Sequence, residues 1–131
     1  MVACSILVVD DEPEIRELLR ILLTGAGHAV LCATDGRAAA KVMEDHAIDL
    51  VITDLLMPER DGLEFIEDVR KNHPDVRIIA MSGGGHIARE NYLKLAKGFG
   101  AHVLLEKPFE PKVVLEAIEA IRTAPQAKPK A

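Results

Sequence analysis

The sequence predicts an α/β fold in which one parallel β-sheet is covered by helices on both faces. Five short apolar runs of strand length alternate with longer segments that repeat at the helical period. The run at residues 50–52 (LVI) has no polar alternation, which is typical of a strand buried on both faces. The connections are short, which favours neighbouring parallel strands joined by right-handed crossovers.

Composition and charge narrow the classes of function. The 131 residues are 49% hydrophobic and 28% charged, which suits one globular domain with a real core. The longest apolar stretches fall far short of the roughly 20 residues that a membrane span needs, and no secretory leader is evident, so we expect a cytoplasmic protein without a membrane role. The net charge of −5 argues against a nucleic-acid surface and favours a cation site.

The cysteines and histidines do not show the spacing of a metal site. Cys4 and Cys32 are expected near opposite ends of neighbouring strands, beyond disulfide reach, and we predict that both are buried free thiols. The histidines are expected at the ends of elements or in loops: His28, His46, His73, His86 and His102.

The first strand is predicted at residues 5–10 (SILVVD), and it ends in the carboxylates of Asp10 and Asp11. Pro13 then opens a helix at a position where its missing N–H is tolerated, and Gly25 follows the helix. The inward stripe of this helix is expected to be Ile15, Leu18, Leu19 and Leu22.

The second strand is predicted at residues 28–33, and Asp35 is expected to cap the helix that follows. The inward residues of that helix are expected to be Ala38, Ala39, Val42 and Met43. The central strand comes next, and its apolar run leads to Asp54. Pro58 discourages further ladder pairing, so Asp54 is predicted at the carboxyl end of the sheet, where open α/β folds bind ligands.

Asp61 is expected to start a third helix, which His73 and Pro74 end. Its inner stripe is expected to be Gly62, Phe65, Ile66 and Val69. The fourth strand is predicted at residues 76–81, and it leads directly to Ser82.

After the glycines at 83–85, a fourth helix is expected to carry one apolar face: Tyr92, Leu95, Ala96 and Phe99. The last strand is predicted at residues 101–105, running towards Lys107. The final helix is expected to bury Val114, Ala117, Ile118 and Ile121. We predict that the domain spans residues 1–122 and that residues 123–131 form a disordered tail.

The predicted topology is a flavodoxin-like (βα)5 sheet with strand order 2-1-3-4-5. A Rossmann-type order would call for a glycine-rich fingerprint after the first strand, where this sequence has acidic residues. In the flavodoxin-like order the first and third strands are neighbours. Asp10, Asp11 and Asp54 are therefore expected to meet at the point where the strand order reverses.

Three converging carboxylates would repel one another unless a cation lay among them. Oxygen ligands in a site open to solvent favour Mg²⁺. The same topology brings Ser82 and Lys107 to this edge of the sheet, where a hydroxyl and an ammonium can bind phosphoryl oxygens. Asp54 is then the candidate nucleophile that forms an aspartyl phosphate, because metal and lysine offset the charge repulsion.

Four separated motifs have the order and spacing of a known family: LVVDDEP at 7–13, ITDLLMPERDGLE at 52–64, IIAMSG at 78–83 and GAHVLLEKPF at 100–109. By these motifs the chain resembles the receiver domain of two-component response regulators, which are CheY-like proteins. The resemblance covers nearly all of the predicted domain.

The resemblance implies a role for each site residue. Asp54 would be the phosphoacceptor, and Asp10 and Asp11 would hold Mg²⁺ together with Asp54 and the backbone carbonyl of Leu56. Ser82 and Lys107 would bind the phosphoryl oxygens. The family also implies a cis peptide between Lys107 and Pro108.

The resemblance implies the partners as well. A sensor histidine kinase or a histidine phosphotransfer protein would donate the phosphoryl group. The fourth helix, last strand and final helix would form the face that docks on an unidentified downstream protein. The chain would catalyse its own phosphorylation and dephosphorylation without being a metabolic enzyme, and it would not bind nucleic acid directly.

Two features depart from the best-known receivers. The position that usually carries an aromatic switch residue is Leu104, so the signal is expected to travel through the loop at 82–86 or through Tyr92. Few residues follow Arg122, so the chain is expected to be either a stand-alone receiver or a piece of a longer regulator.

Two other classes of protein could carry a similar set of acidic residues. A phosphohydrolase of the haloacid dehalogenase type also uses an aspartate nucleophile with Mg²⁺, but it places its two acids two residues apart, whereas Asp10 and Asp11 are adjacent. A receiver with a vestigial site could act as an interaction module that does not depend on phosphorylation.

Overall fold

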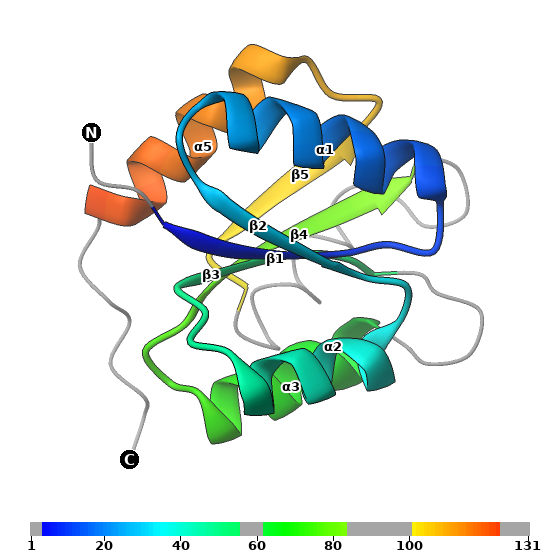
Figure 1. Ribbon diagram of the computed structural model, residues 1–131, viewed down its shortest axis with the longest axis vertical. Coiled ribbons are helices and arrows are strands. Elements are labelled where there is room, and N and C mark those ends of the chain that lie inside the picture. The colour runs from blue at the N-terminus through cyan, green and yellow to red at the C-terminus, as the bar shows by residue number, and fades with distance from the viewer. Residues whose placement is uncertain (1–3, 56–61, 84–100, 124–131) are drawn as a thin grey trace.

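A five-stranded parallel sheet forms the centre of the protein, with strand order β2-β1-β3-β4-β5 (Figure 1). The computed structural model describes residues 4–55, 62–83 and 101–123. The strands are β1 (Ser5–Val9), β2 (Ala29–Ala33), β3 (Leu50–Asp54), β4 (Arg77–Gly83) and β5 (Val103–Lys107). The predicted flavodoxin-like α/β fold and its strand order are confirmed.

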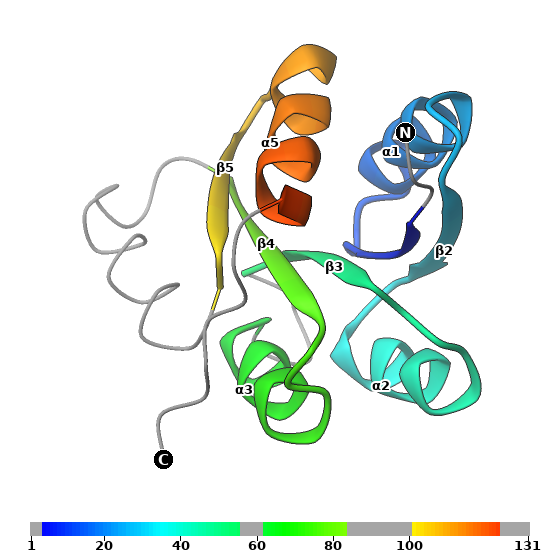
Figure 2. The ribbon, with the colours of Figure 1, turned by 90° about the vertical axis from the view of Figure 1, so that its left-hand side faces the viewer.

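The helices cover both faces of the sheet (Figures 1 and 2). Helices α1 (Pro13–Gly25) and α5 (Pro111–Thr123) lie on one face, and α2 (Gly36–Asp45) and α3 (Gly62–Asn72) lie on the other. Alternate residues of each strand point to opposite faces, so the strands supply two separate cores. In β1, Ile6 and Val8 pack on the α1 and α5 side, whereas Leu7 and Val9 pack on the α2 and α3 side.

The inward stripe of α1 differs from the predicted one. Leu19 is buried as expected, and Ile15 and Leu22 are partly buried against the same core. Leu18, however, is 44% exposed, and the fully buried Leu23 takes the place assigned to it. The helix is rotated so that positions 19 and 23, one turn apart, face the sheet.

Helix α2 begins as the sequence predicts. The Oδ1 atom of Asp35 accepts a hydrogen bond from the Ala38 N–H at 2.8 Å, which satisfies one of the free donors of the first turn. Ala39 and Met43 are buried, and Ala38 and Val42 pack partly buried against them. The inward stripe of this helix is confirmed.

The last two strands extend further than predicted. Strand β4 continues to Gly83, and β5 begins two residues later than expected and includes Lys107. The register pairs Ser82 with Glu106 and Gly83 with Lys107, so the two strands continue to pair beyond the predicted end of each. In α5 the predicted core residues are confirmed, with Val114, Ile118 and Ile121 buried and Ala117 partly buried.

The cysteine prediction is partly wrong. Both thiols are free and lie at different levels of the sheet, since Cys32 pairs with Val8 and Cys4 precedes β1. Cys4 is buried, but Cys32 is exposed. Strand β2 is an edge strand with a neighbour on one side only, so its residues are covered less than those of the inner strands.

Several sequence predictions lie outside the described residues. These are the start of the third helix at Asp61, the fourth helix with its face at 92–99, Leu56, His86 and the tail beyond Thr123, which itself belongs to α5. Within the described ranges, every helix is too short or too polar to cross a membrane.

Candidate functional site

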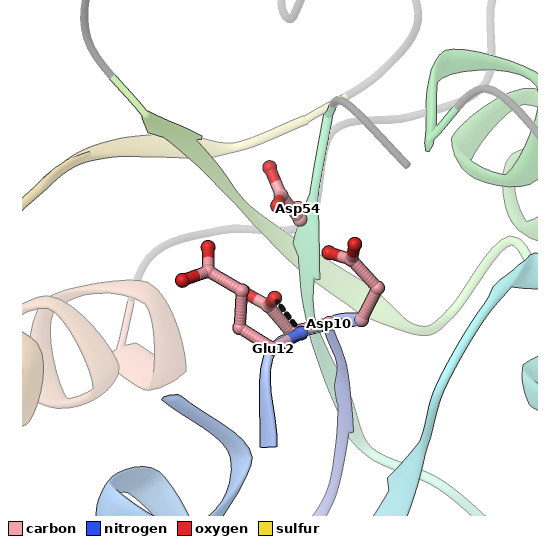
Figure 3. A group of neighbouring side chains, drawn as sticks. Asp10, Glu12 and Asp54 are labelled. Carbon is pink, nitrogen blue, oxygen red and sulfur yellow. Dashed lines mark hydrogen bonds between the residues drawn. The ribbon is translucent and has the colours of Figure 1, made fainter. Parts of the chain in front are cut away.

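The candidate site lies where β1 and β3 end side by side. Val9 pairs with Thr53 in the parallel register, so Asp10 and Asp54 follow at the same edge of the sheet. Carboxylate oxygens of Asp10, Asp11, Glu12 and Asp54 lie within 4.8 Å of one another. Figure 3 shows three of these side chains gathered at the strand ends. The predicted meeting of Asp10, Asp11 and Asp54 is confirmed.

Asp10 is fully buried and makes hydrogen bonds through its backbone N–H, its carboxylate and its carbonyl. Its backbone N–H donates to the Ala33 carbonyl at 3.2 Å, which extends the pairing with β2. Its Oδ1 atom accepts from the Glu12 N–H at 2.9 Å, and its carbonyl accepts from Arg16 Nη1 at 2.8 Å. These hydrogen bonds therefore connect the turn between β1 and α1 to Asp10.

Asp54 is the last residue of β3 and is 5% exposed. It pairs with Met81 of β4, and the next N–H, that of Leu55, donates to the Met81 carbonyl at 3.0 Å. The backbone on both sides of Asp54 is thus held in the sheet. The flanking strands keep this carboxylate at the switch point of the fold.

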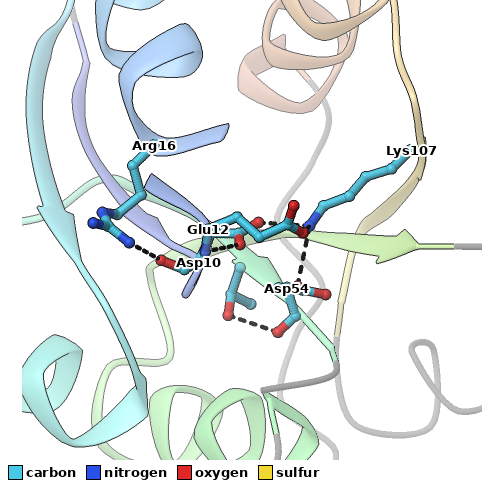
Figure 4. Close-up of polar contacts among 6 residues, drawn as sticks. Asp10, Glu12, Arg16, Asp54 and Lys107 are labelled. Atoms are coloured by element: carbon cyan, nitrogen blue, oxygen red, sulfur yellow. Dashed lines mark hydrogen bonds and ion pairs between the residues drawn. The ribbon is translucent and has the colours of Figure 1, made fainter. Parts of the chain in front are cut away.

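Lys107 reaches this group of carboxylates from the end of β5 (Figure 4). Its Nζ atom lies 2.7 Å from Asp10 Oδ2, 3.1 Å from Asp54 Oδ2 and 3.2 Å from Glu12 Oε1. Burial by itself would lower the pKa of Lys107. The hydrogen bond to Asp10 and the charge of Asp54 outweigh burial and raise this pKa above its ordinary value, so the ammonium stays charged at neutral pH.

Ser82 lies on β4 directly after Met81, the partner of Asp54, and is buried. It therefore reaches the same edge of the sheet, as predicted. The expected cis peptide between Lys107 and Pro108 is confirmed. Leu104, at the usual aromatic position, is partly buried against the core on the α2 and α3 side.

The donor set fits a hard divalent cation. All four clustered ligands are carboxylates, two of them buried and two exposed, so an ion could bind protein oxygens and keep several waters. A positive charge already lies among them in the form of the Lys107 ammonium. The two buried carboxylates of the site, those of Asp10 and Asp54, therefore favour a positive charge between them.

Sequence reasoning did not assign Glu12 to the site. The sequence did show it as the third member of the acidic run 10–12. Its side chain is 58% exposed, and only the orientation in the folded protein shows that its carboxylate turns towards Lys107. Neither hydrophobic periodicity nor motif spacing carries that information.

Comparison with known proteins agrees with this geometry. A family model described as the response regulator receiver domain matches residues 6–119. The response regulator GtcR of Aneurinibacillus migulanus is 36% identical over 118 residues, covering 90% of this chain. The chemotaxis protein CheY4 of Vibrio cholerae is similar in structure, with a TM-score of 0.83 and 30% identity over 92% of this chain and 99% of CheY4.

A further structural relative was solved with ligands. The response regulator TrrA of Thermotoga maritima, in complex with Mg²⁺ and BeF, has a TM-score of 0.78 and 33% identity, covering 90% of this chain and 98% of TrrA. Curated relatives are longer, and the chain spans less than half their length, for example 46% of GtcR.

Proposed function

The chain belongs to the response regulator receiver domain family, and from this premise we propose that it is a phosphorylation-controlled signalling domain whose acceptor is Asp54. One observation carries the proposal. The Lys107 ammonium lies within hydrogen-bond distance of both the buried Asp10 and the buried Asp54, at the carboxyl edge of a parallel sheet. An aspartate beside an ammonium and further carboxylates suits attack on phosphorus.

The reaction would be a transfer from a phosphohistidine. A carboxylate oxygen of Asp54 attacks phosphorus, an O–P bond forms, and the P–N bond breaks. The electron pair of that bond returns to the imidazole nitrogen of the donor, which takes up a proton. Ser82 and Lys107 would bind the phosphoryl oxygens from the neighbouring strand ends.

Mg²⁺ fits the proposed reaction. Asp10, Asp11 and Asp54 would hold the ion, together with the backbone carbonyl of Leu56, which lies outside the described residues. Bound there, Mg²⁺ would offset negative charge so that an anionic phosphoryl group can approach a carboxylate. The oxygen-only donor set supports this assignment.

The proposed partners follow from the family. The donor would be a histidine kinase or a histidine phosphotransfer protein, and the output would be docking on a downstream protein through the face that contains β5 and α5. The chain would promote its own phosphorylation and dephosphorylation and turn over no metabolite.

The proposal is tested by incubating the protein with acetyl phosphate, with and without Mg²⁺, and measuring intact mass. We expect one added phosphoryl group that depends on Mg²⁺ and is absent from Asp54→Asn. Asp45→Asn, which changes an exposed carboxylate at the end of α2, is the matched control and should react like the wild type. A folded, Mg²⁺-loaded wild type without the adduct would favour the interaction module with a vestigial site.

A further inference from the structure

The three carboxylate partners of Lys107 use all of its donors. An ammonium group has three N–H bonds. The Nζ atom is paired with one oxygen each from Asp10, Asp54 and Glu12. A phosphoryl oxygen that binds Lys107 must therefore replace one of these partners.

The three partners differ in how easily they can be replaced. Asp10 and Asp54 have side chains that are 0% and 7% exposed, so breaking either contact would leave a buried carboxylate without this cation. The Glu12 side chain is 58% exposed and has the longest of the three contacts, at 3.2 Å. Exposed ion pairs contribute little, so the Glu12 contact is the one that exchanges at least cost.

Among the described residues, the Glu12 side chain is paired with Lys107 alone. Glu12 is the N-cap residue of α1, but its side chain makes no capping hydrogen bond. Its backbone N–H donates to Asp10, and that contact does not depend on the side chain. The exposed carboxylate of Glu12 is thus directed at Lys107 (Figure 4).

We propose that the Glu12 carboxylate accepts the hydrogen bond from Lys107 that a phosphoryl oxygen would otherwise accept. Glu12 and the incoming phosphoryl group then compete for Lys107. This inference rests on the proposed function and adds a regulating residue to the same site. The Glu12 carboxylate also lies within 4.8 Å of the other three, so its charge favours a bound cation while it opposes a bound anion.

Glu12→Gln tests the competition with a stable phosphoryl mimic. Beryllium fluoride binding at saturating Mg²⁺ is measured by fluorine NMR. The substitution removes the charge and leaves only a neutral amide oxygen, which is a weaker acceptor for an ammonium than a carboxylate is. Binding of the mimic should therefore become tighter, by roughly two- to fivefold for an interaction of this exposure. Glu14→Gln is the control, because it removes an exposed acid in the first turn of the same helix, outside the carboxylate cluster, and should bind the mimic like the wild type.

Mg²⁺ binding without the mimic, measured by calorimetry, should change in the opposite direction. Glu12→Gln should bind the ion more weakly, by roughly two- to fivefold, because one nearby negative charge is lost. General damage to the site would weaken the binding of both the ion and the mimic, whereas loss of the competing carboxylate should weaken the binding of the ion and tighten that of the mimic.

The outcomes separate this inference from the proposed function. Tighter binding of the mimic together with weaker binding of Mg²⁺ supports the role of Glu12. Unchanged or weaker binding of the mimic in Glu12→Gln, with a wild type that binds it, overturns the role of Glu12 alone. A folded wild type that binds no mimic at saturating Mg²⁺ overturns both.

Discussion

Lys107 is the residue on which the charge balance of the site depends. Its ammonium is the positive group paired with both Asp10 and Asp54 in the described part of the chain. Buried carboxylates that lose this ammonium repel each other and are poorly hydrated. The ammonium and a divalent ion would both be attracted to these oxygens. Lys107 and the ion would therefore compete for the same carboxylates, and their like charges would repel each other.

Lys107→Met should therefore lower stability and change its response to Mg²⁺. We expect the free energy of unfolding at pH 7 without Mg²⁺ to fall by about 1–3 kcal/mol, because the paired carboxylates stay buried without the ammonium. Urea unfolding with and without Mg²⁺ measures this. Added Mg²⁺ should stabilise the variant more than the wild type, because the ion replaces the lost positive charge.

The control for this prediction is Lys112→Met. Lys112 is 84% exposed and lies 3.8 Å from the exposed Glu116, so the same substitution should change stability by less than about 0.5 kcal/mol. Equal losses at the two lysines would contradict the special position of Lys107.

At the scale of the element, α1 shows how a helix is positioned by the sheet that it covers. Its sequence offers several apolar residues, and more than one arrangement of them would form a stripe at the helical period. The core selects Leu19 and Leu23, while Leu18 and Ile21 are left 44% and 59% exposed. The start of the helix is fixed separately, by the turn that holds Asp10.

Leu23→Ala and Leu18→Ala form a matched pair that tests this orientation. Leu23 is fully buried, so its truncation should cost about 2–5 kcal/mol from lost burial and the cavity left behind. Leu18→Ala removes the same atoms from a largely exposed position and should cost less than about 1 kcal/mol. Chemical denaturation of both variants decides between the two stripes, and equal costs would mean that α1 packs on a different face.

At the scale of the whole molecule, a histidine directly before each edge strand accepts a hydrogen bond from a backbone N–H elsewhere in the fold. His28 directly precedes edge strand β2, and its Nδ1 atom accepts the Cys4 N–H at 3.0 Å. His102 directly precedes the other edge strand, β5, and its Nδ1 atom accepts the Ile78 N–H at 3.1 Å. An Nδ1 atom that accepts cannot carry a proton, so both contacts require this nitrogen to be unprotonated.

Global stability should consequently fall as His102 becomes protonated. Burial, followed by the charges of Arg70 and Arg77, lowers the pKa of His102 below its ordinary value of 6.5. The unfolded chain then binds this proton more readily than the folded one, so stability is lost as the pH falls through about 6.5. One proton limits the slope to about 1.4 kcal/mol per pH unit, and the partial exposure of this side chain reduces it.

His102→Asn isolates this effect, because the asparagine oxygen can accept the Ile78 N–H and does not titrate. The loss of unfolding free energy between pH 7 and about 5.5 should be smaller in this variant than in the wild type. His46→Asn, at an exposed histidine, should keep the pH dependence of the wild type. Identical pH profiles for all three proteins would rule out a contribution from His102.

The fold and most of the site could be predicted from the sequence because both follow from order along the chain. Apolar runs without alternation identify buried parallel strands, and the carboxyl ends of such strands share one edge. These two rules place Asp10, Asp11, Asp54 and Ser82 at one edge of the sheet, and the structure agrees. The matching family model covers the same part of the chain.

The features that only the tertiary structure decided depend on contacts between elements. The rotation of α1 that exposes Leu18, the extension of β5 through Lys107 and the exposure of Cys32 on an edge strand all depend on neighbours distant in sequence. The orientation of Glu12 is of the same kind, since its partner is Lys107 on the last strand. Local patterns determine which elements form and in what order, whereas packing and charge between distant elements determine which face each one presents.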